Sequence, residues 1–224
     1  MQNQEDLSNR QIQFLSVTGF EPAGHNHGLD SRPVGIFESE SCITDESGQC
    51  QVKYTAGDAS GADKITASVV DTNSSMISAS LELSIKVPGL VNFGTSSLWR
   101  LTGETGLHPD NHYLDETGTL GAFGLAVDFY ETYNATLGLN DMSLPLGGLF
   151  DIDGAWASPH KLHRTGRSVD IDRCALVNDP GNPTLPRGLC PQGWAAVPRK
   201  EIEKICKEKN GRLINESTYH CEFK

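Results

Sequence analysis

The first part of the chain alternates apolar and polar side chains with a period of two. The alternation recurs in four runs: Ile12 and Phe14; Val52, Tyr54 and Ala56; Ile65, Ala67 and Val69; and Leu81, Leu83, Ile85 and Val87. Such a period puts apolar side chains on one face of an antiparallel strand. Turn-forming clusters at 57–61 and 71–75 separate the runs, and no helical period appears. The pattern predicts an all-β, immunoglobulin-like sandwich over residues 1–93.

The second part mixes helical and extended patterns. Residues 94–116 are small and polar and predict a linker. A helix is expected from a cap at Thr117 or Thr119 to about Leu137, with an apolar stripe at Leu120, Phe123, Val127 and Tyr130. A second helix is expected from Pro198 to Asn210 and Gly211, and strands at 168–171 and within 212–224. We therefore expect a small α+β domain over 117–224.

Charge and hydropathy narrow the range of partners. The 224-residue chain carries a formal net charge of −11 and has a pI of about 5.0. No basic stripe is present to bind phosphates, so nucleic acid is not expected as a partner. No apolar run approaches the ~18 residues that span a bilayer, so no membrane span is expected.

The six cysteines fall into three pairs that are local in sequence. Six cysteines allow 15 connectivities, and the spacing favours 42–50, 174–190 and 206–221. Disulfides persist in oxidising compartments. We expect an extracellular, periplasmic or cell-surface protein, although the polar N-terminus lacks the apolar segment of a secretion signal.

Residues 47–69 read SGQCQVKYTAGDASGADKITASV. This stretch resembles the bacterial immunoglobulin-like repeats of adhesins and large surface proteins. The resemblance implies a spacer or docking module and says little about chemistry.

The stretch at 156–172, WASPHKLHRTGRSVDID, concentrates candidate metal ligands. His163 and Asp170 supply imidazole and carboxylate, the donors that borderline divalent metals such as Zn²⁺ accept. Two ligands do not complete a tetrahedral site. His220 is the histidine that remains downstream, on an alternating segment that directs it away from the apolar residues Tyr219 and Cys221. Three ligands and a water would form an open, catalytic type of zinc site.

The pattern H-x6-D, followed by a lone histidine near the C-terminus, resembles a group of zinc peptidases. The group includes the D-alanyl-D-alanine peptidases, the penicillin-insensitive murein endopeptidases and the Hedgehog signalling domain. The resemblance covers about residues 140–224 and implies that His163, Asp170 and His220 bind Zn²⁺. It also implies hydrolysis of peptide bonds, with cell-wall peptides as a candidate substrate, in which Zn²⁺ polarises the scissile carbonyl and activates water.

The chain departs from the group at the general base. Relatives carry Glu or His two or three residues before the last ligand, where this chain has Thr218 and Ser217. Glu216 is the first candidate for the base and Glu222 the second, while His160 is a candidate to stabilise the oxyanion or orient the water. The alternative to a peptidase is a non-catalytic zinc-binding surface or interaction protein of Hedgehog-like fold.

The remaining histidines and acidic residues are predicted to be non-ligands. Glycines flank His25 and His27, so these two histidines are expected in an exposed loop. For His108 and His112, the nearby Pro109 and Asn111 favour a linker or rim position. We expect three carboxylates at turns or on the surface: Asp151, Asp153 and Asp172. Asp172 is close enough in sequence to Asp170 to contact a ligand.

Overall fold

The computed structural model describes residues 8–19, 23–71, 73–157, 162–179, 184–215 and 218–224. It is mostly β, with two α-helices and several sheets. The chain divides into two compact units: unit 1 comprises 1–22 and 28–85, and unit 2 comprises 23–27 and 86–224. Residues 86–93 and the expected linker at 94–116 thus belong to unit 2. Their strands pair within that unit, β7 (Val91–Asn92) with β9 (Tyr113–Leu114) and β8 (Trp99–Leu101) with β10 (Ala135–Leu139).

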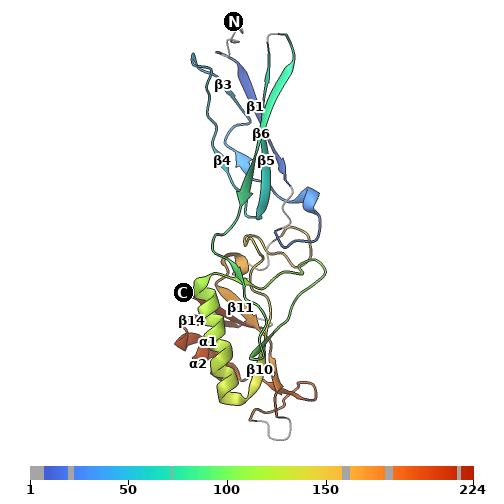
Figure 1. Ribbon diagram of the computed structural model, residues 1–224, viewed down its shortest axis with the longest axis vertical. Helices are drawn as coiled ribbons and strands as arrows, with labels where there is room; N and C mark the ends of the chain where they lie inside the picture. Colours follow the sequence, from blue (N-terminus) through green and yellow to red (C-terminus); the bar gives the residue numbers. More distant parts are fainter. Residues whose placement is uncertain (1–7, 20–22, 72, 158–161, 180–183, 216–217) are drawn as a thin grey trace. The chain divides into compact units, whose positions relative to one another are not determined.

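Unit 1 is built on a four-stranded antiparallel sheet in the order β3-β1-β5-β6 (Figure 1). A two-stranded sheet, β2–β4, accompanies it, and burial along β1 alternates residue by residue, as the period-two pattern predicts. The immunoglobulin-like sandwich itself stays a prediction. The elements of unit 1 are β1 (Gln11–Thr18), η1 (Leu29–Ser31), β2 (Ile36–Phe37), β3 (Ser41–Ile43), β4 (Tyr54–Thr55), β5 (Gly61–Val70) and β6 (Met76–Ile85).

A buried ion pair fixes the interior of unit 1. The Arg32 guanidinium contacts the Asp63 carboxylate, and both side chains are almost fully buried. The Tyr54 hydroxyl donates to Asp63 at 2.6 Å, and the Gly35 N–H donates to the same carboxylate at 3.1 Å. These bonds satisfy a charge that would be costly to bury alone.

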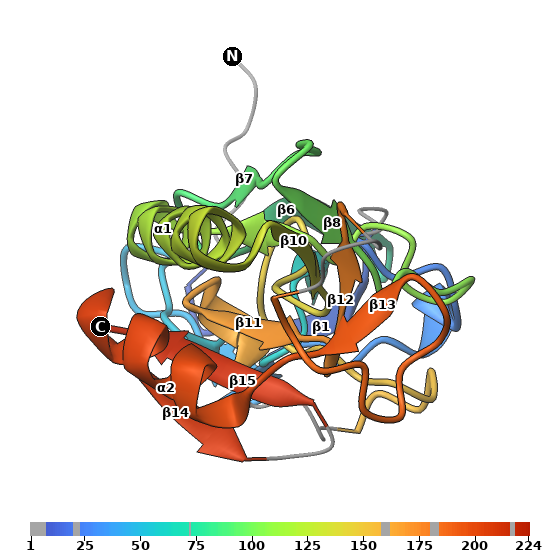
Figure 2. The same cartoon turned by 90° about the horizontal axis from the view of Figure 1, so that it is seen from below.

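Unit 2 holds the main apolar core, between two helices and a seven-stranded sheet in the order β13-β12-β10-β11-β15-β14, with β8 beside β10. Helices α1 and α2 lie side by side against this sheet (Figure 2). The remaining elements are α1 (Glu116–Tyr133), η2 (His163–Thr165), β11 (Ser168–Ile171), β12 (Cys174–Val177), β13 (Trp194–Ala196), α2 (Arg199–Glu208), β14 (Gly211–Asn215) and β15 (Tyr219–Phe223).

Helix α1 differs from its prediction at both ends. Its cap is Asp115, whose side chain accepts the Gly118 N–H at 2.7 Å, rather than Thr117 or Thr119. It ends at Tyr133, because Asn134 adopts a left-handed conformation. The following residues, expected to be helical up to Leu137, form the buried strand β10.

The buried face of α1 also differs from the predicted stripe. Leu120 and Phe123 are 66% and 48% exposed, while Ala122, Leu125, Ala126 and Phe129 face the core. Small residues allow this close approach. A Cβ at Gly121 would lie 2.3 Å from the Phe223 ring, and one at Gly118 would lie 2.1 Å from the Gly166 carbonyl oxygen. The buried face of the helix therefore combines small residues, which allow close approach, with the large side chains of Leu125 and Phe129.

Three disulfides form with the predicted connectivity: Cys42–Cys50, Cys174–Cys190 and Cys206–Cys221. The last one joins α2 to β15, next to His220. Disulfide pairing of all six cysteines fits an oxidising compartment. Among the described residues, no helix is long and apolar enough to cross a membrane.

Candidate metal centres

Unit 2 brings His163, Asp170 and His220 together in what we call the three-ligand cluster. Strands β11 and β15 are antiparallel neighbours, and their register places Asp170 directly opposite His220. Residues opposite each other on paired strands project to the same face. The Asp170 Oδ1 atom consequently lies 2.8 Å from His220 Nδ1.

His163 reaches the cluster from the turn that precedes β11. It begins the short helix η2, which ends at Gly166 with φ of 72°. A Cβ at Gly166 would lie 2.3 Å from Leu90 and 2.7 Å from the Asp115 backbone nitrogen, so glycine fits this turn for two reasons. The turn brings His163 Nε2 to 3.6 Å from Asp170 Oδ1 and packs its ring edge-on against His220, with centroids 4.8 Å apart.

The three-ligand cluster is buried and polarised. His163, Asp170 and His220 are 1%, 4% and 1% exposed. Burial alone would raise the pKa of the Asp170 carboxyl, but the nearby His163 imidazole and the hydrogen bond with His220 hold that pKa well below its ordinary value. An ionised carboxylate beside two imidazoles is a donor set that suits a borderline divalent metal.

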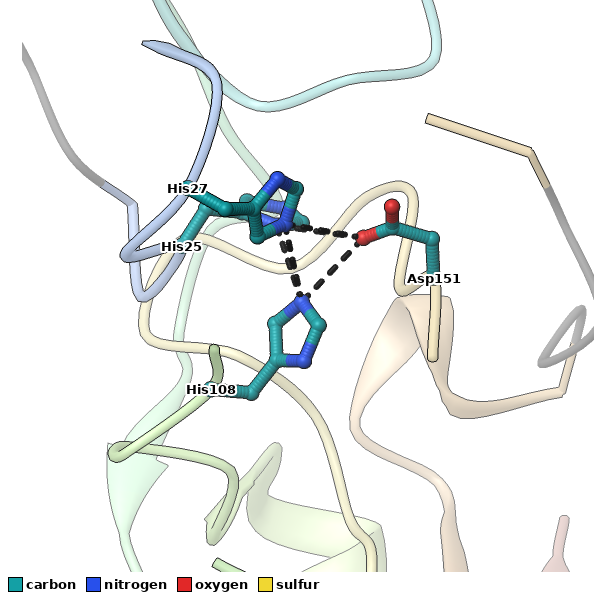
Figure 3. Close-up of side chains that lie close together, drawn as sticks. All are labelled: His25, His27, His108 and Asp151. Atoms are coloured by element: carbon teal, nitrogen blue, oxygen red, sulfur yellow. Dashed lines mark hydrogen bonds and ion pairs between the residues drawn. The ribbon is translucent and has the colours of Figure 1, made fainter. Parts of the chain in front are cut away.

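A second group, which we call the four-ligand cluster, consists of His25, His27, His108 and Asp151 (Figure 3). Its members come from three loops of unit 2. The segments that carry His25 and His108 are joined by hydrogen bonds from Asn26, whose N–H donates to Leu107 and whose side chain donates to Gly106.

Four atoms of this cluster approach one another closely. His25 Nδ1, His27 Nε2 and His108 Nε2 are 3.1–3.2 Å apart. Asp151 Oδ1 lies 3.4, 3.2 and 3.1 Å from the same three nitrogens. Four donor atoms thus converge on one point.

Neighbouring groups orient the cluster. The Nε2 atom of His25 is 3.0 Å from the Leu149 carbonyl oxygen, and the Trp156 N–H donates to Asp151 Oδ2 at 2.7 Å. The Trp156 ring lies against His25 and His27, with centroids 4.5 and 4.9 Å away. Trp156 itself has φ of 53°, a left-handed conformation that a bulky residue rarely adopts. Strained backbone of this kind gathers at functional sites.

Burial sets the protonation of the four-ligand cluster. Burial, together with neighbouring His108, lowers the pKa of His25 to about 4, and burial also lowers the pKa of His108. Burial would raise the pKa of Asp151, but the hydrogen bond from Trp156 and the nearby His27 and His25 bring it below its ordinary value. Burial thus favours the neutral form of the His25 and His108 imidazoles, beside a carboxyl group whose ionised form is favoured.

Four predictions about this cluster are wrong. His25 and His108 were expected at an exposed loop and at a linker or rim, yet each is 2% exposed. The His27 side chain is 8% exposed rather than in an open loop. Asp151, expected at a turn or surface, is 1% exposed. The sequence neighbours of these residues do not indicate the contacts that bury them: His25 and His27 meet His108 across 83 and 81 residues, and His108 meets Asp151 across 43.

The other candidate residues lie apart from the two clusters. His112 is buried with Nε2 2.8 Å from the Thr102 carbonyl oxygen, which corrects its expected linker or rim position. Asp153 is exposed, as predicted. Asp172 accepts the Thr102 hydroxyl at 3.2 Å and lies 3.7 Å from the Arg100 guanidinium, with no contact to either cluster among the described residues.

The candidate bases are only partly described. Glu216 and His160 lie outside the described residues. Glu222 pairs with Arg212, whose guanidinium donates to it at 2.8 Å, and Thr218 is half-buried just before β15.

One signal could have revealed the four-ligand cluster. His-x-His at 25–27 is a compact pair of zinc-type donors, and the chain carries further histidines with no chemistry assigned to them. Known proteins give no further guide: no family model matches the chain, and no curated protein and no solved structure is significantly similar to it.

Proposed function

We propose that unit 2 is a zinc-dependent peptidase that acts outside the cytoplasm, on peptides such as those of the cell wall. The observation that carries the proposal is the convergence of His163, Asp170 and His220 on the face shared by β11 and β15. These three residues are the ligands that the resemblance to the peptidase group implies. That implication comes from the sequence alone, so the convergence of the three side chains is independent support for it.

The donor set fits zinc better than a hard cation. Two imidazole nitrogens and one carboxylate oxygen match tetrahedral Zn²⁺, whereas Ca²⁺ and Mg²⁺ require mostly oxygen ligands. Three protein ligands leave one position for water, as catalytic zinc sites do. A zinc ion there would supply Lewis-acid activation of water and of the scissile carbonyl.

The protein's own groups have distinct roles in this proposal. Asp170 offers one oxygen to the metal while its backbone is fixed by two hydrogen bonds, to Asn140 and Asp141, at 2.7 and 2.9 Å. This anchoring keeps the ligand in place during turnover. Glu216 is the proposed general base, and His160 the group that orients water or stabilises the oxyanion.

Two further features support the proposed location of the protein and the proposed role of unit 1. The three disulfides favour an oxidising compartment outside the cytoplasm. We assign unit 1 the role of an immunoglobulin-like spacer or docking module, in line with its antiparallel sheet and its resemblance to bacterial surface repeats.

Two observations support a second candidate function. Glu222 is engaged by Arg212, and Thr218 stands where relatives carry the base. A chain without a working base would bind metal and a partner without hydrolysis. Glu216→Gln distinguishes the two functions, because it removes the proposed base and leaves all three ligands.

The test is hydrolysis of purified peptidoglycan and of its cross-linked peptides by the zinc-loaded full chain, followed by mass spectrometry of the products. We expect new amine and carboxyl termini with the wild type, and a loss of about 10²–10⁴-fold in rate with Glu216→Gln. Zinc content should stay unchanged in that variant. Absence of cleavage by a wild type that holds zinc at His163 would reject the peptidase for these substrates and favour the non-catalytic candidate.

A further inference from the structure

The four-ligand cluster has the dimensions of a tetrahedral metal site. Its six donor–donor distances, among His25 Nδ1, His27 Nε2, His108 Nε2 and Asp151 Oδ1, all lie between 3.1 and 3.4 Å. The centre of a regular tetrahedron with edges of about 3.2 Å lies about 2.0 Å from each corner, the distance at which Zn²⁺ binds imidazole nitrogen and carboxylate oxygen.

Hydrogen bonds among the four side chains do not explain this geometry. The Leu149 carbonyl oxygen only accepts, so the proton of a neutral His25 belongs on Nε2 and a lone pair on Nδ1 faces the cluster. Neutral His27 and His108 can each contribute at most one N–H to the centre, and each N–H points in one direction. Two such donors cannot serve six short contacts.

The charge of the cluster calls for a cation. Asp151 is 1% exposed, and its ion-pair partners within the part of the chain that the structure describes are the three histidines rather than a lysine or arginine. A buried carboxylate without a permanent positive partner is unstable. A divalent cation at the centre would compensate it and bind three imidazole lone pairs.

The site is closed. The side chains of His25, His27, His108 and Asp151 are 0–8% exposed, and the Trp156 ring covers two of the imidazoles. Two ligands also have the outer contacts typical of metal sites, His25 with the Leu149 carbonyl and Asp151 with the Trp156 N–H. Four protein ligands mark a structural zinc site, since a catalytic one keeps a position open.

We propose that His25, His27, His108 and Asp151 form a structural Zn²⁺ site that fastens the segment 23–27 to the loops carrying His108 and Asp151. The three segments are loops, with little regular strand pairing to hold them. One metal with four ligands would join these loops, which have few backbone hydrogen bonds between strands, and would stabilise this part of unit 2. The site is separate from the proposed peptidase centre and does not depend on its activity.

The zinc content of the purified full chain, measured by elemental mass spectrometry after dialysis, tests the site. We expect about two zinc ions per chain in the wild type and about one in His108→Ala, in Asp151→Ala and in His163→Ala. His112→Ala is the matched control, because His112 is equally buried but bonds to a backbone carbonyl, and it should retain about two.

The outcomes separate the two centres. If His108→Ala and Asp151→Ala keep the wild-type zinc content, the structural site is rejected. If only His163→Ala keeps it, the structural site stands and the proposed peptidase centre fails. Where His108→Ala does not fold, Co²⁺ is loaded into the folded His163→Ala variant. We expect the intense visible absorption of tetrahedral cobalt there, and a weak octahedral spectrum would overturn the proposal.

Discussion

The two histidine–aspartate clusters of unit 2 contain similar donors on different scaffolds. The three-ligand cluster is held by hydrogen-bonded strands, with Asp170 opposite His220 and His163 on the turn before β11. The four-ligand cluster is held by loops, with no ligand on a strand or helix. A scaffold of strands can position its ligands without a metal, whereas the loops would be further stabilised by the proposed metal.

The number of protein ligands also distinguishes the roles that we expect for the two clusters. Three protein ligands leave room for water and suit catalysis, and four close the coordination sphere and suit stabilisation. One side chain links the two clusters: the Phe150 ring lies 5.1 Å from the His108 ring and 6.2 Å from the His163 ring, centre to centre. We therefore expect the two sets of similar donors to have different functions, according to the number of ligands and the scaffold that holds them.

The largest difference is expected from removing one ligand of each cluster. His163→Ala should lower peptide hydrolysis by about 10³-fold or more, because the metal that activates water is lost. Its melting temperature should change by only a few degrees, since the strands remain paired. Hydrolysis rates and thermal unfolding are measured on the same preparation. A stable variant with wild-type activity would contradict the assignment.

The opposite result is expected for the loop cluster. Asp151→Ala should cost roughly 3–5 kcal/mol of unfolding free energy, about 10 °C in melting temperature, because the metal no longer joins the loops. A chelator should destabilise the wild type by a similar amount. It should have much less effect on the variant, which has already lost this metal. Equal chelator effects on both would show that Asp151 holds no stabilising metal.

Two glycines provide a matched pair of smaller perturbations. Gly166 has φ of 72°, and a Cβ there would meet Leu90. Gly154 has φ of 69°, and a Cβ there would lie 3.2 Å from the His27 ring. Gly154→Ala should cost about 1–2 kcal/mol, and Gly166→Ala should cost more because its Cβ would also meet the Asp115 backbone. Each variant should weaken zinc binding about tenfold at the adjacent cluster only. Zinc titrations of both variants check this, and weakening at both clusters in each variant would show that they are not independent.

The smallest effect is expected at the side chain that lies between the clusters. Phe150→Leu keeps an apolar group but removes the ring edges that contact His108 and His163, at a stability cost of about 1 kcal/mol. Peptide hydrolysis should fall by less than about tenfold, with both zinc ions retained. Loss of either zinc ion would mean that the ring is required for binding rather than for fine positioning.

The sequence predicted the three-ligand cluster because most of the residues that indicate it lie close together in the chain. His163, Gly166 and Asp170 lie within eight residues, and His220 sits on a clear alternating strand. The same reasoning anticipated the three disulfides, helix α2 and the period-two strand β1. Apart from His220, which lies 50 residues from Asp170, the residues that decide these features are near neighbours in the chain.

The four-ligand cluster was not predicted because the contacts that form it join residues far apart in the sequence. The contacts of His25 reach His108, 83 residues away, and Leu149, 124 residues away, and no periodicity encodes such distances. The predicted buried face of helix α1 was wrong for a related reason. Leu120 and Phe123 suggested the buried face, but the face that packs on the core carries Leu125 and Phe129 together with small residues, among them Gly121, where a Cβ would meet the Phe223 ring. Tertiary contacts decided both.

The most direct measurement is anomalous diffraction at the zinc absorption edge from crystals of the full chain. We expect two peaks per chain. One should lie within about 2.0–2.2 Å of four protein ligands, His25, His27, His108 and Asp151, and the other within that range of three, His163, Asp170 and His220. A single peak, or two peaks with equal numbers of protein ligands, would contradict the distinction between a structural and a catalytic centre.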